Sequence, residues 1–221
     1  MPDLALPCLC LVTDRNQCKS RPLEEVVALA VDGGVNMVQL REKDLKASEL
    51  LPLAIRLRDI CKGKALLFIN DSLDVALACG ADGVQLGEDA VSVAEARSVA
   101  GDRILIGSSV HDVEKAIQAE ADGADLLIVG TIFPTGSHPE ASPAGVIFLE
   151  DVHDKVTVPF IGIGGVKESN VEDVIKARAS GAAVISAIVA SDEPRDAARS
   201  IANKMAHAWS ARTQTGVKDS K

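Results

Sequence analysis

The sequence predicts a single α/β domain folded as a (β/α)8 barrel, the TIM barrel, and three observations support this prediction. Short runs of branched aliphatic residues alternate with longer segments of helical periodicity along the chain. There are eight such runs, the number that closes a parallel sheet into this barrel. The length of 221 residues suits one barrel, and a composition of 47% hydrophobic but only 2% aromatic residues supplies aliphatic side chains for a sheet buried on both faces.

Each expected strand is a short apolar run that mostly ends in glycine or in polar residues. In chain order the strands are expected at CLCLVTD (8–14), NMVQLRE (36–42), ALLFIN (65–70), GVQLG (83–87), ILIGSSV (104–110), LLIVG (126–130), PFIGIG (159–164) and AAVISAIV (182–189). Segments with helical spacing, such as residues 22–34 and 111–124, lie between them. A doubly wound open sheet is the alternative, but no GxGxxG motif follows the first strand.

Glycines recur just before predicted strands and are expected to end the helices that precede them. These positions are the pairs Gly33-Gly34, Gly80-Ala81, Gly123-Ala124 and Gly181-Ala182, where glycine adopts a left-handed conformation without steric cost. The barrel is expected over residues 1–209. Residues 210–221 are polar and lack periodicity, and they are predicted to form a frayed C-terminal tail.

The composition excludes several classes of function. A formal net charge of −9 argues against a nucleic-acid-binding surface, so an anionic ligand needs a local pocket. Five cysteines without a CxxC motif do not form a disulfide framework and favour a reducing compartment. No apolar run reaches the roughly 18 residues of a membrane span. A soluble, cytoplasmic protein is expected, and its oligomeric state stays open, with a homo-oligomer as one alternative.

In a TIM barrel the active site lies at the C-terminal ends of the strands, so residues there are site candidates. Gln39, Arg41 and Lys43 alternate along the end of the second expected strand, and this spacing places their side chains on one face. The two cations are expected to bind one anion. The alternative is an ordinary charged rim. For a buried strand, that alternative is less favoured because buried charge is costly without a partner.

The third expected strand ends in Asn70 and Asp71. One interpretation is a helix N-cap, a position that both residue types favour. The other is a Mg²⁺ site, because this ion takes few carboxylates together with the oxygens of a phosphorylated substrate. Arg41 and Lys43, which follow the neighbouring strand, favour the second interpretation.

A long loop rich in small and hydroxyl residues follows the sixth expected strand, and such loops often close over ligands. Thr135, Ser137 and His138 are expected to donate hydrogen bonds to phosphate oxygens, with solvated surface as the alternative for His138. His111 is expected to begin a helix, and His153 and His207 to lie on helix surfaces.

The seventh and eighth expected strands end in GIGGV and VISAI. Barrels often bind phosphate with the loops after these strands, through backbone N–H groups and a helix N-terminus. Gly164 and Gly165 permit a close approach of the ligand, and Ser186 adds a hydroxyl. Two anion sites would thus face each other, as expected for an enzyme that joins two phosphorylated small molecules and binds neither nucleic acid nor membrane.

Taken together these motifs resemble the thiamine phosphate synthase family. The resemblance rests on LVTD, VQLREKD, FINDSLDVALACGADGVQLG, GSSVH, VGTIFPT, IGIGG and ISAI, in this order. It implies a transferase that condenses hydroxymethylpyrimidine diphosphate with thiazole phosphate, giving thiamine phosphate and pyrophosphate. The diphosphate would leave first, and the thiazole nitrogen would capture the resulting carbocation.

The resemblance also implies roles for individual residues. The diphosphate and the pyrimidine would be bound by Gln39, Arg41, Lys43 and Asn70. The pocket would be completed by Ser109, Thr135, Ser137 and His138. The thiazole phosphate would be bound by Gly164, Gly165, Ile185 and Ser186. Arg41, Lys43, Ser109 and His138 would be catalytic. Mg²⁺ would be the cofactor, with Asp71 as its first ligand.

Several positions depart from the family pattern. Gln85 replaces a histidine after the fourth strand, and Ala90 replaces the second aspartate that binds the metal. Half of the metal site is thus lost unless Glu88 or Asp89 takes this place, and Asp89 is the carboxylate expected to do so. His138 stands where the family has a lysine. A related branch, the thiazole tautomerases, also has a Gln-Leu pair after the fourth strand, but Thr131 replaces its catalytic histidine. A tautomerase-like isomerase and a non-catalytic barrel that binds thiazole phosphate are the alternative functions.

Overall fold

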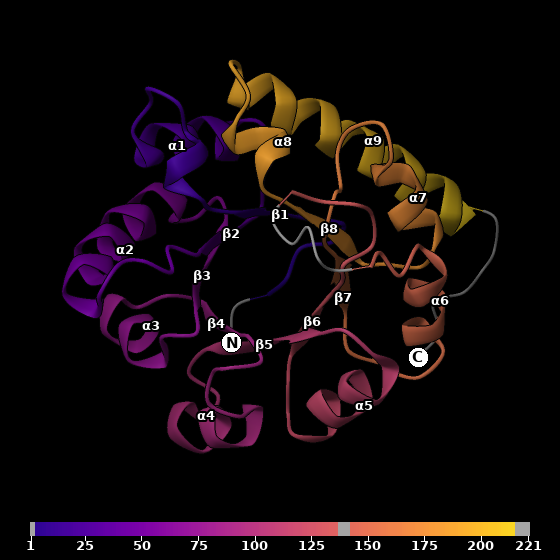
Figure 1. The fold of residues 1–221 in the computed structure, drawn as a ribbon, viewed down its shortest axis with the longest axis horizontal. Helices are drawn as coiled ribbons and strands as arrows, with labels where there is room; N and C mark the ends of the chain where they lie inside the picture. The colour runs from indigo at the N-terminus through magenta and orange to yellow at the C-terminus, as the bar shows by residue number, and fades with distance from the viewer. Residues whose placement is uncertain (1–2, 137–141, 215–221) are drawn as a thin grey trace.

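The structure is a computed structural model that describes residues 3–136 and 142–214 (Figure 1). Eight parallel strands form a closed barrel in which each strand pairs with its neighbours in sequence and β8 pairs with β1. Figure 1 shows the helices arranged around the outside of this sheet. The predicted (β/α)8 barrel is therefore confirmed, and the open-sheet alternative is wrong.

The elements alternate as the periodicity predicts. The strands are β1 (Cys8–Val12), β2 (Met37–Leu40), β3 (Leu66–Asn70), β4 (Gly83–Leu86), β5 (Leu105–Val110), β6 (Leu126–Val129), β7 (Phe160–Gly162) and β8 (Gly181–Val184). The helices are α1 (Leu23–Asp32), α2 (Ala47–Cys61), α3 (Leu73–Cys79), α4 (Val93–Ala100), α5 (Val113–Ala121), α6 (Ile147–His153), α7 (Val171–Lys176), α8 (Ser186–Val189) and α9 (Pro194–Gln214), with a short 3-10 helix, η1 (Arg15–Gln17). None of the described helices is both long enough and apolar enough to cross a lipid bilayer.

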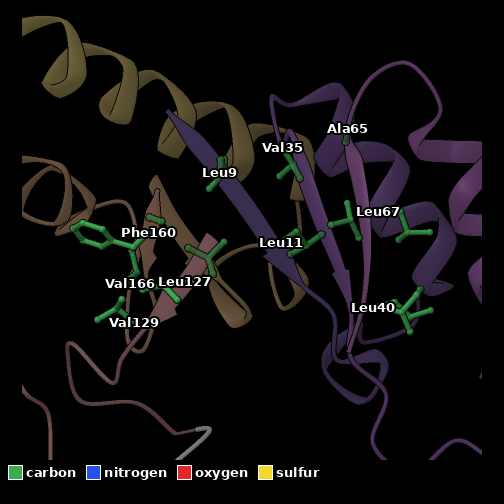
Figure 2. Packing of buried hydrophobic residues seen from close by; sticks show 14 of the residues in the cluster. Leu9, Leu11, Val35, Leu40, Ala65, Leu67, Leu127, Val129, Phe160 and Val166 are labelled. Carbon is green, nitrogen blue, oxygen red and sulfur yellow. The ribbon is translucent and has the colours of Figure 1, made fainter. Parts of the chain in front are cut away.

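Alternation along each strand divides the apolar side chains into two clusters. Cys8, Cys10 and Met37 point into the barrel, together with Phe68 and other residues of the inner cluster. Their neighbours point outward and pack against the helices, and Figure 2 shows part of this outer cluster, including Leu9 and Leu11. The five cysteines are free, and burial raises the pKa of the Cys8 thiol to about 12, which suits a packing role.

The last predicted strand is too long. Residues 182–189 were expected to be extended, but β8 ends at Val184 and Ser186 begins the short helix α8. The backbone of Ile185 lies outside the β region, at φ −116° and ψ −90°, and separates the two elements. A continuous apolar run does not distinguish a buried strand from a buried helix, and this explains the error.

Gly181 was expected to end a helix, but it is the first residue of β8. A Cβ there would lie 2.0 Å from the carbonyl oxygen of Cys8, so glycine allows β1 and β8 to pair. The left-handed position before this strand belongs to Arg178, at φ 74°. At Gly80 the expectation is confirmed, because this residue ends α3 with φ 67°.

The expected tail boundary also shifts. Helix α9 packs against α1 and α7 and continues to Gln214, so residues 210–214 are helical and residues 215–221 lie outside the described part. Arg212 Nη1 donates hydrogen bonds of 3.0 Å to the carbonyl oxygens of Ile175 and Ala179, and its guanidinium lies 4.1 Å from the centre of the Trp209 ring. These contacts order a polar segment that local periodicity cannot identify.

A repeated side-chain contact joins strands at the N-terminal end of the barrel. Asn36, Asp82 and Asp125 directly precede β2, β4 and β6, and each accepts a hydrogen bond from a backbone N–H near the start of the preceding strand. Asp125 accepts at 2.7 Å from Ile106 and also pairs with Arg97 at 2.5 Å. These contacts lie away from the C-terminal ends of the strands, so we assign them to stability.

Replacing Asp125 by alanine is expected to lower the free energy of unfolding by about 1.5–3 kcal/mol, because the buried amide of Ile106 loses its side-chain acceptor and the guanidinium of Arg97 loses its carboxylate partner. Urea unfolding measures this loss. Asp102→Ala is the matched control: Asp102 is 89% exposed and lies 4.0 Å from the same arginine, so its loss should change stability by less than about 0.5 kcal/mol. Equal effects of the two substitutions would contradict the assignment.

Candidate active site

A cavity of about 800 Å³ opens at the C-terminal ends of the strands. Apolar side chains of Val12, Ile128 and Ile163 form part of its wall. The polar and charged side chains around it are Gln39, Arg41, Lys43, Glu88, Asp89, Ser109, His111, Thr131, Thr135, Ser142, Lys167 and Ser186. The size suits a pair of small substrates, and the location is the catalytic face of this fold.

The end of β2 brings three expected residues into the cavity. Gln39 is buried, and its Nε2 donates a 2.8 Å hydrogen bond to Asn70 Oδ1, whereas no protein donor reaches its Oε1 within the described residues. Arg41 and Lys43 follow the strand and line the same cavity, as the alternation predicts. Neither forms an ion pair with a described carboxylate, so both cations are available to a ligand. In the alternative interpretation, a charged rim, neighbouring carboxylates would neutralise Arg41 and Lys43, and the described residues supply none.

Asn70 and Asp71 connect β3 to the loop after β4. Asn70 Nδ2 donates to Asp71 Oδ2 at 2.6 Å, and the N–H of Gly87 donates to Asp71 Oδ1 at 2.8 Å. Asp71 has a left-handed backbone with φ 59°. The helix-capping alternative is wrong, because Ser72 is the N-cap of α3 and makes no side-chain capping bond. Each carboxylate oxygen of Asp71 keeps a lone pair for a further partner.

The two carboxylates after β4 differ in their surroundings. Glu88 forms an ion pair with Lys115, which lowers the pKa of the Glu88 carboxyl first through the hydrogen bond and then through its charge, with a smaller effect from His111. Asp89 is exposed, lines the cavity and has no partner among the described residues. Ala90 is half-buried and packs against the outer apolar cluster. Asp89 is therefore the carboxylate that remains available at the cavity.

Strand β5 contributes Ser109 and is followed by His111, both of which line the cavity. His111 was expected to begin a helix, but Asp112 is the N-cap of α5 and accepts a 2.7 Å hydrogen bond from the N–H of Lys115. His111 Nδ1 instead lies 2.5 Å from the carbonyl oxygen of Gly130, so Nδ1 carries the hydrogen. Its Nε2 is the nitrogen left for a ligand.

The loop after β6 packs on the double glycine after β7. Gly164 and Gly165 have φ values of 98° and 62°, and a Cβ on Gly165 would lie 2.4 Å from the carbonyl oxygen of Pro134. The N–H of Phe133 donates a 3.0 Å hydrogen bond to the carbonyl oxygen of Gly164. Glycine is thus required at both positions. Thr135 lines the cavity, whereas Ser137 and His138 lie outside the described residues.

The last part of the cavity comes from β8 and the loop after β7. Ile185 and Ser186 line it together with Gly164 and Gly165, and Ser186 begins α8, whose first N–H groups lack acceptors within the helix. Lys167 also lines the cavity, is exposed and forms no ion pair among the described residues. Backbone N–H groups and a cation therefore line the same cavity as Arg41 and Lys43 but come from other strands, an arrangement that suits a phosphate.

The sequence model of a family described as thiamine monophosphate synthase matches residues 9–188, which include nearly the whole barrel and every residue that lines the cavity. The chain belongs to the thiamine monophosphate synthase family. This match confirms the family that the sequence motifs indicated, and it confirms the prediction that the chain is an enzyme.

Relatives of this synthase family support the assignment. A protein of Methanoculleus marisnigri named thiamine-phosphate synthase is 42% identical over 202 residues, covering 90% of this chain and 96% of the relative. A putative thiamine-phosphate synthase of Geobacter sulfurreducens is 44% identical over 195 residues, covering 87% and 92%. The solved thiamine phosphate pyrophosphorylase of Pyrococcus furiosus has a TM-score of 0.84 at 34% identity, over 91% of this chain and 96% of that one.

A more distant structure shows the fold alone. It is described as 3-hexulose-6-phosphate synthase and has a TM-score of 0.71 at 21% identity, covering 89% of this chain and 99% of that chain. The barrel is thus shared with other chemistries, and function depends on the residues of the cavity.

Sequence reasoning missed two candidate residues of this synthase-family site. His111 directly follows β5 and Lys167 follows the double glycine after β7. Both follow barrel strands at the catalytic face, so their positions in the sequence could have identified them as candidate site residues. Two further histidines lie elsewhere: His207 is exposed on α9, and His153 ends α6 with its ring 6.4 Å from that of Phe160.

Proposed function

We propose that this protein condenses hydroxymethylpyrimidine diphosphate with thiazole phosphate to form thiamine phosphate and pyrophosphate. The observation that carries the proposal is that two groups of cations without an ion-pair partner among the described residues line one cavity, in a chain whose net charge is −9. Arg41 and Lys43 lie at the end of β2, and Lys167 lies beside the glycines after β7. Two separated cationic regions suit two phosphorylated substrates.

In this proposal the diphosphate is bound on the β2 side. Arg41 offers a planar fork of donors and Lys43 a point charge, and both stabilise negative charge as the C–O bond to the diphosphate breaks. The buried Oε1 of Gln39 accepts a hydrogen bond from an N–H of the pyrimidine, which satisfies an acceptor that no donor of the described residues reaches. Asn70 fixes Gln39 in position through their 2.8 Å hydrogen bond.

The thiazole phosphate is bound on the β7–β8 side. The positive-φ backbone at Gly164 and Gly165 allows the phosphate to approach, and Ser186 contributes its hydroxyl and the start of α8. Ile185 and Ile163 border the same region and exclude water from the reacting carbon. Once the diphosphate has left, the thiazole nitrogen captures the pyrimidine carbocation and forms the new C–N bond, so the protein acts mainly by alignment and electrostatic stabilisation.

The donor set also fits Mg²⁺. Asp71 and Asp89 would hold the ion. Asp71 retains free lone pairs and accepts a hydrogen bond from Gly87 of the cavity wall, and Asp89 lines the cavity without a partner among the described residues. The described residues contain no group of three or more His, Cys, Asp or Glu side chains that could hold a metal, so substrate oxygens and water would complete the coordination. When bound, the ion supplies positive charge to the leaving diphosphate.

Replacing Asp89 by asparagine is expected to raise the Mg²⁺ concentration for half-maximal activity by about tenfold or more, because a charged ligand is lost. Titration of activity with Mg²⁺ measures the change. Glu88→Gln is the matched control one residue earlier, and it should leave the Mg²⁺ requirement unchanged because Glu88 already pairs with Lys115. A larger effect at Glu88 than at Asp89 would show that the metal site has been misplaced.

The isomerase alternative has less support. Thr131 lies at the cavity where the tautomerase branch has its catalytic histidine, and the two relatives described above are named synthase and putative synthase. A cytoplasmic location is proposed as well, supported by five free cysteines, four of them buried.

The direct test of the proposed function is to incubate the protein with both substrates and Mg²⁺ and to detect thiamine phosphate after oxidation to its fluorescent thiochrome. Product is expected only when both substrates are present. Conversion of the thiazole substrate without the diphosphate would instead favour the isomerase, and binding of both substrates without product would favour a non-catalytic barrel.

A further inference from the structure

We propose that Gln85 is a positioning residue that fixes the hydroxyl hydrogen of Ser109 toward the cavity, where it donates to an oxygen of the diphosphate. The inference rests on the proposed function, because the group that accepts the hydrogen bond from Ser109 is the diphosphate of the proposed substrate. Gln85 is fully buried in β4 and is not part of the cavity wall, whereas Ser109 is. Gln85 therefore acts through Ser109 and does not touch substrate.

The contact between the two side chains determines which atom donates. Gln85 Nε2 donates a 3.0 Å hydrogen bond to Ser109 Oγ. A serine hydroxyl has one hydrogen, and once its oxygen accepts from Gln85 that hydrogen must point elsewhere. No described protein acceptor receives it. The remaining direction is the cavity that Ser109 lines.

The orientation of the Gln85 amide is fixed by the contact of its oxygen, Oε1, with Gly107. Its Oε1 lies 2.1 Å from the position that a Cβ on Gly107 would occupy, so it faces the Cα hydrogen of that glycine. The amide oxygen of Gln85 can accept a weak hydrogen bond from this Cα–H. If the amide were flipped, the hydrogens of its NH₂ group would face the Cα hydrogen and repel it. Gly107 is the strand partner of Gln85 across β4 and β5, and its missing side chain provides the space.

This arrangement leaves Oε1 without a protein N–H or O–H donor in the described part of the chain. A buried amide oxygen without a strong partner is costly, and a leucine or methionine would fill the same space without that cost. The cost is offset if the amide N–H preorganises a donor for the charge that develops on the leaving group. A positioning role accounts for a polar side chain here.

The test is a double-mutant cycle on kcat with Gln85→Met and Ser109→Ala. Methionine conserves volume but removes the N–H, so Gln85→Met should lower kcat by about tenfold in the wild-type background and have little effect in the Ser109→Ala background. The KM for thiazole phosphate should stay unchanged in each variant. An equal loss in both backgrounds would show that Gln85 only packs, and would overturn the proposal.

An isosteric variant tests the polarity of the contact. Gln85→Glu presents an acceptor to Ser109 and turns the hydroxyl hydrogen away from the cavity, so it should lower kcat more than methionine does. Urea unfolding of each variant shows whether the fold is retained, and the methionine variant decides the outcome if the buried carboxylate prevents folding. Equal activity of the glutamate variant and the wild-type protein would contradict the proposed direction of the hydrogen.

A binding measurement separates this inference from the proposed function. Inorganic pyrophosphate with Mg²⁺ is the probe, and calorimetry should give a weaker affinity for Gln85→Met than for the wild type, but no difference between Ser109→Ala and the double variant. Absence of thiamine phosphate with the wild-type protein would refute the proposed function alone. A pyrophosphate affinity that does not respond to Gln85 would refute the positioning role.

Discussion

Replacing Arg41 by methionine is expected to lower kcat/KM for the pyrimidine diphosphate by about 100-fold or more, equivalent to about 2.7 kcal/mol of transition-state stabilisation. Arg41 lines the cavity, and no described carboxylate neutralises it, so its charge is available to the leaving diphosphate. Methionine keeps much of the side-chain volume and removes only the charged fork. Steady-state kinetics with each substrate varied in turn measures the loss.

Two controls limit the interpretation of this result. Arg41→Lys retains the charge without the fork, and it should recover part of the activity, because lysine cannot bind two oxygens in a bidentate manner. Lys62→Met removes an exposed cation next to the C-terminus of α2 and should leave kcat/KM unchanged. An unchanged kcat/KM in Arg41→Met would refute the placement of the diphosphate beside β2.

Replacing Gly165 by alanine is expected to abolish measurable binding of thiazole phosphate. The new Cβ would lie 2.4 Å from the carbonyl oxygen of Pro134 and 2.8 Å from Cβ of Phe133, and the residue would be held at φ 62°. Backbone atoms cannot move aside cheaply, so the loop after β6 must shift and the cavity changes shape. Calorimetry with thiazole phosphate measures the binding.

Gly63→Ala separates backbone strain from steric clash. Gly63 has φ 72°, but no described atom outside its own chain neighbours lies within 4 Å of the place that a Cβ would take, so alanine there introduces only the left-handed strain. This control should lower stability by about 1 kcal/mol and leave binding intact. If Gly165→Ala binds thiazole phosphate as well as Gly63→Ala does, the loop after β7 is not part of the site.

Much of the fold could be predicted because barrel formation depends on patterns that are local in sequence. Branched aliphatic runs such as that around Leu67 are buried on both faces, so they appear as continuous apolar segments. Most of the cavity could also be predicted from the ends of these strands. Closure of the sheet brings the C-terminal ends of all strands together, and with them Gln39, Arg41 and Ser109.

The features that were missed depend on contacts between distant segments. Gly181 was interpreted as the end of a helix, yet its constraint comes from Cys8, which is far from it in the sequence. Arg212 orders the end of α9 by bonding to backbone carbonyls of residues 175 and 179. His111 is directed into the site region by the carbonyl of Gly130, which follows the next strand. Periodicity and spacing contain none of this information.

The most direct test of the proposed synthesis is a quantitative comparison of pyrophosphate released with thiamine phosphate formed, in Mg²⁺ and after chelation. A synthase is expected to give equal amounts of the two products, to depend on both substrates, to lose activity on chelation and to recover it when Mg²⁺ is restored. Measurable binding of thiazole phosphate without release of pyrophosphate under any metal condition would contradict it.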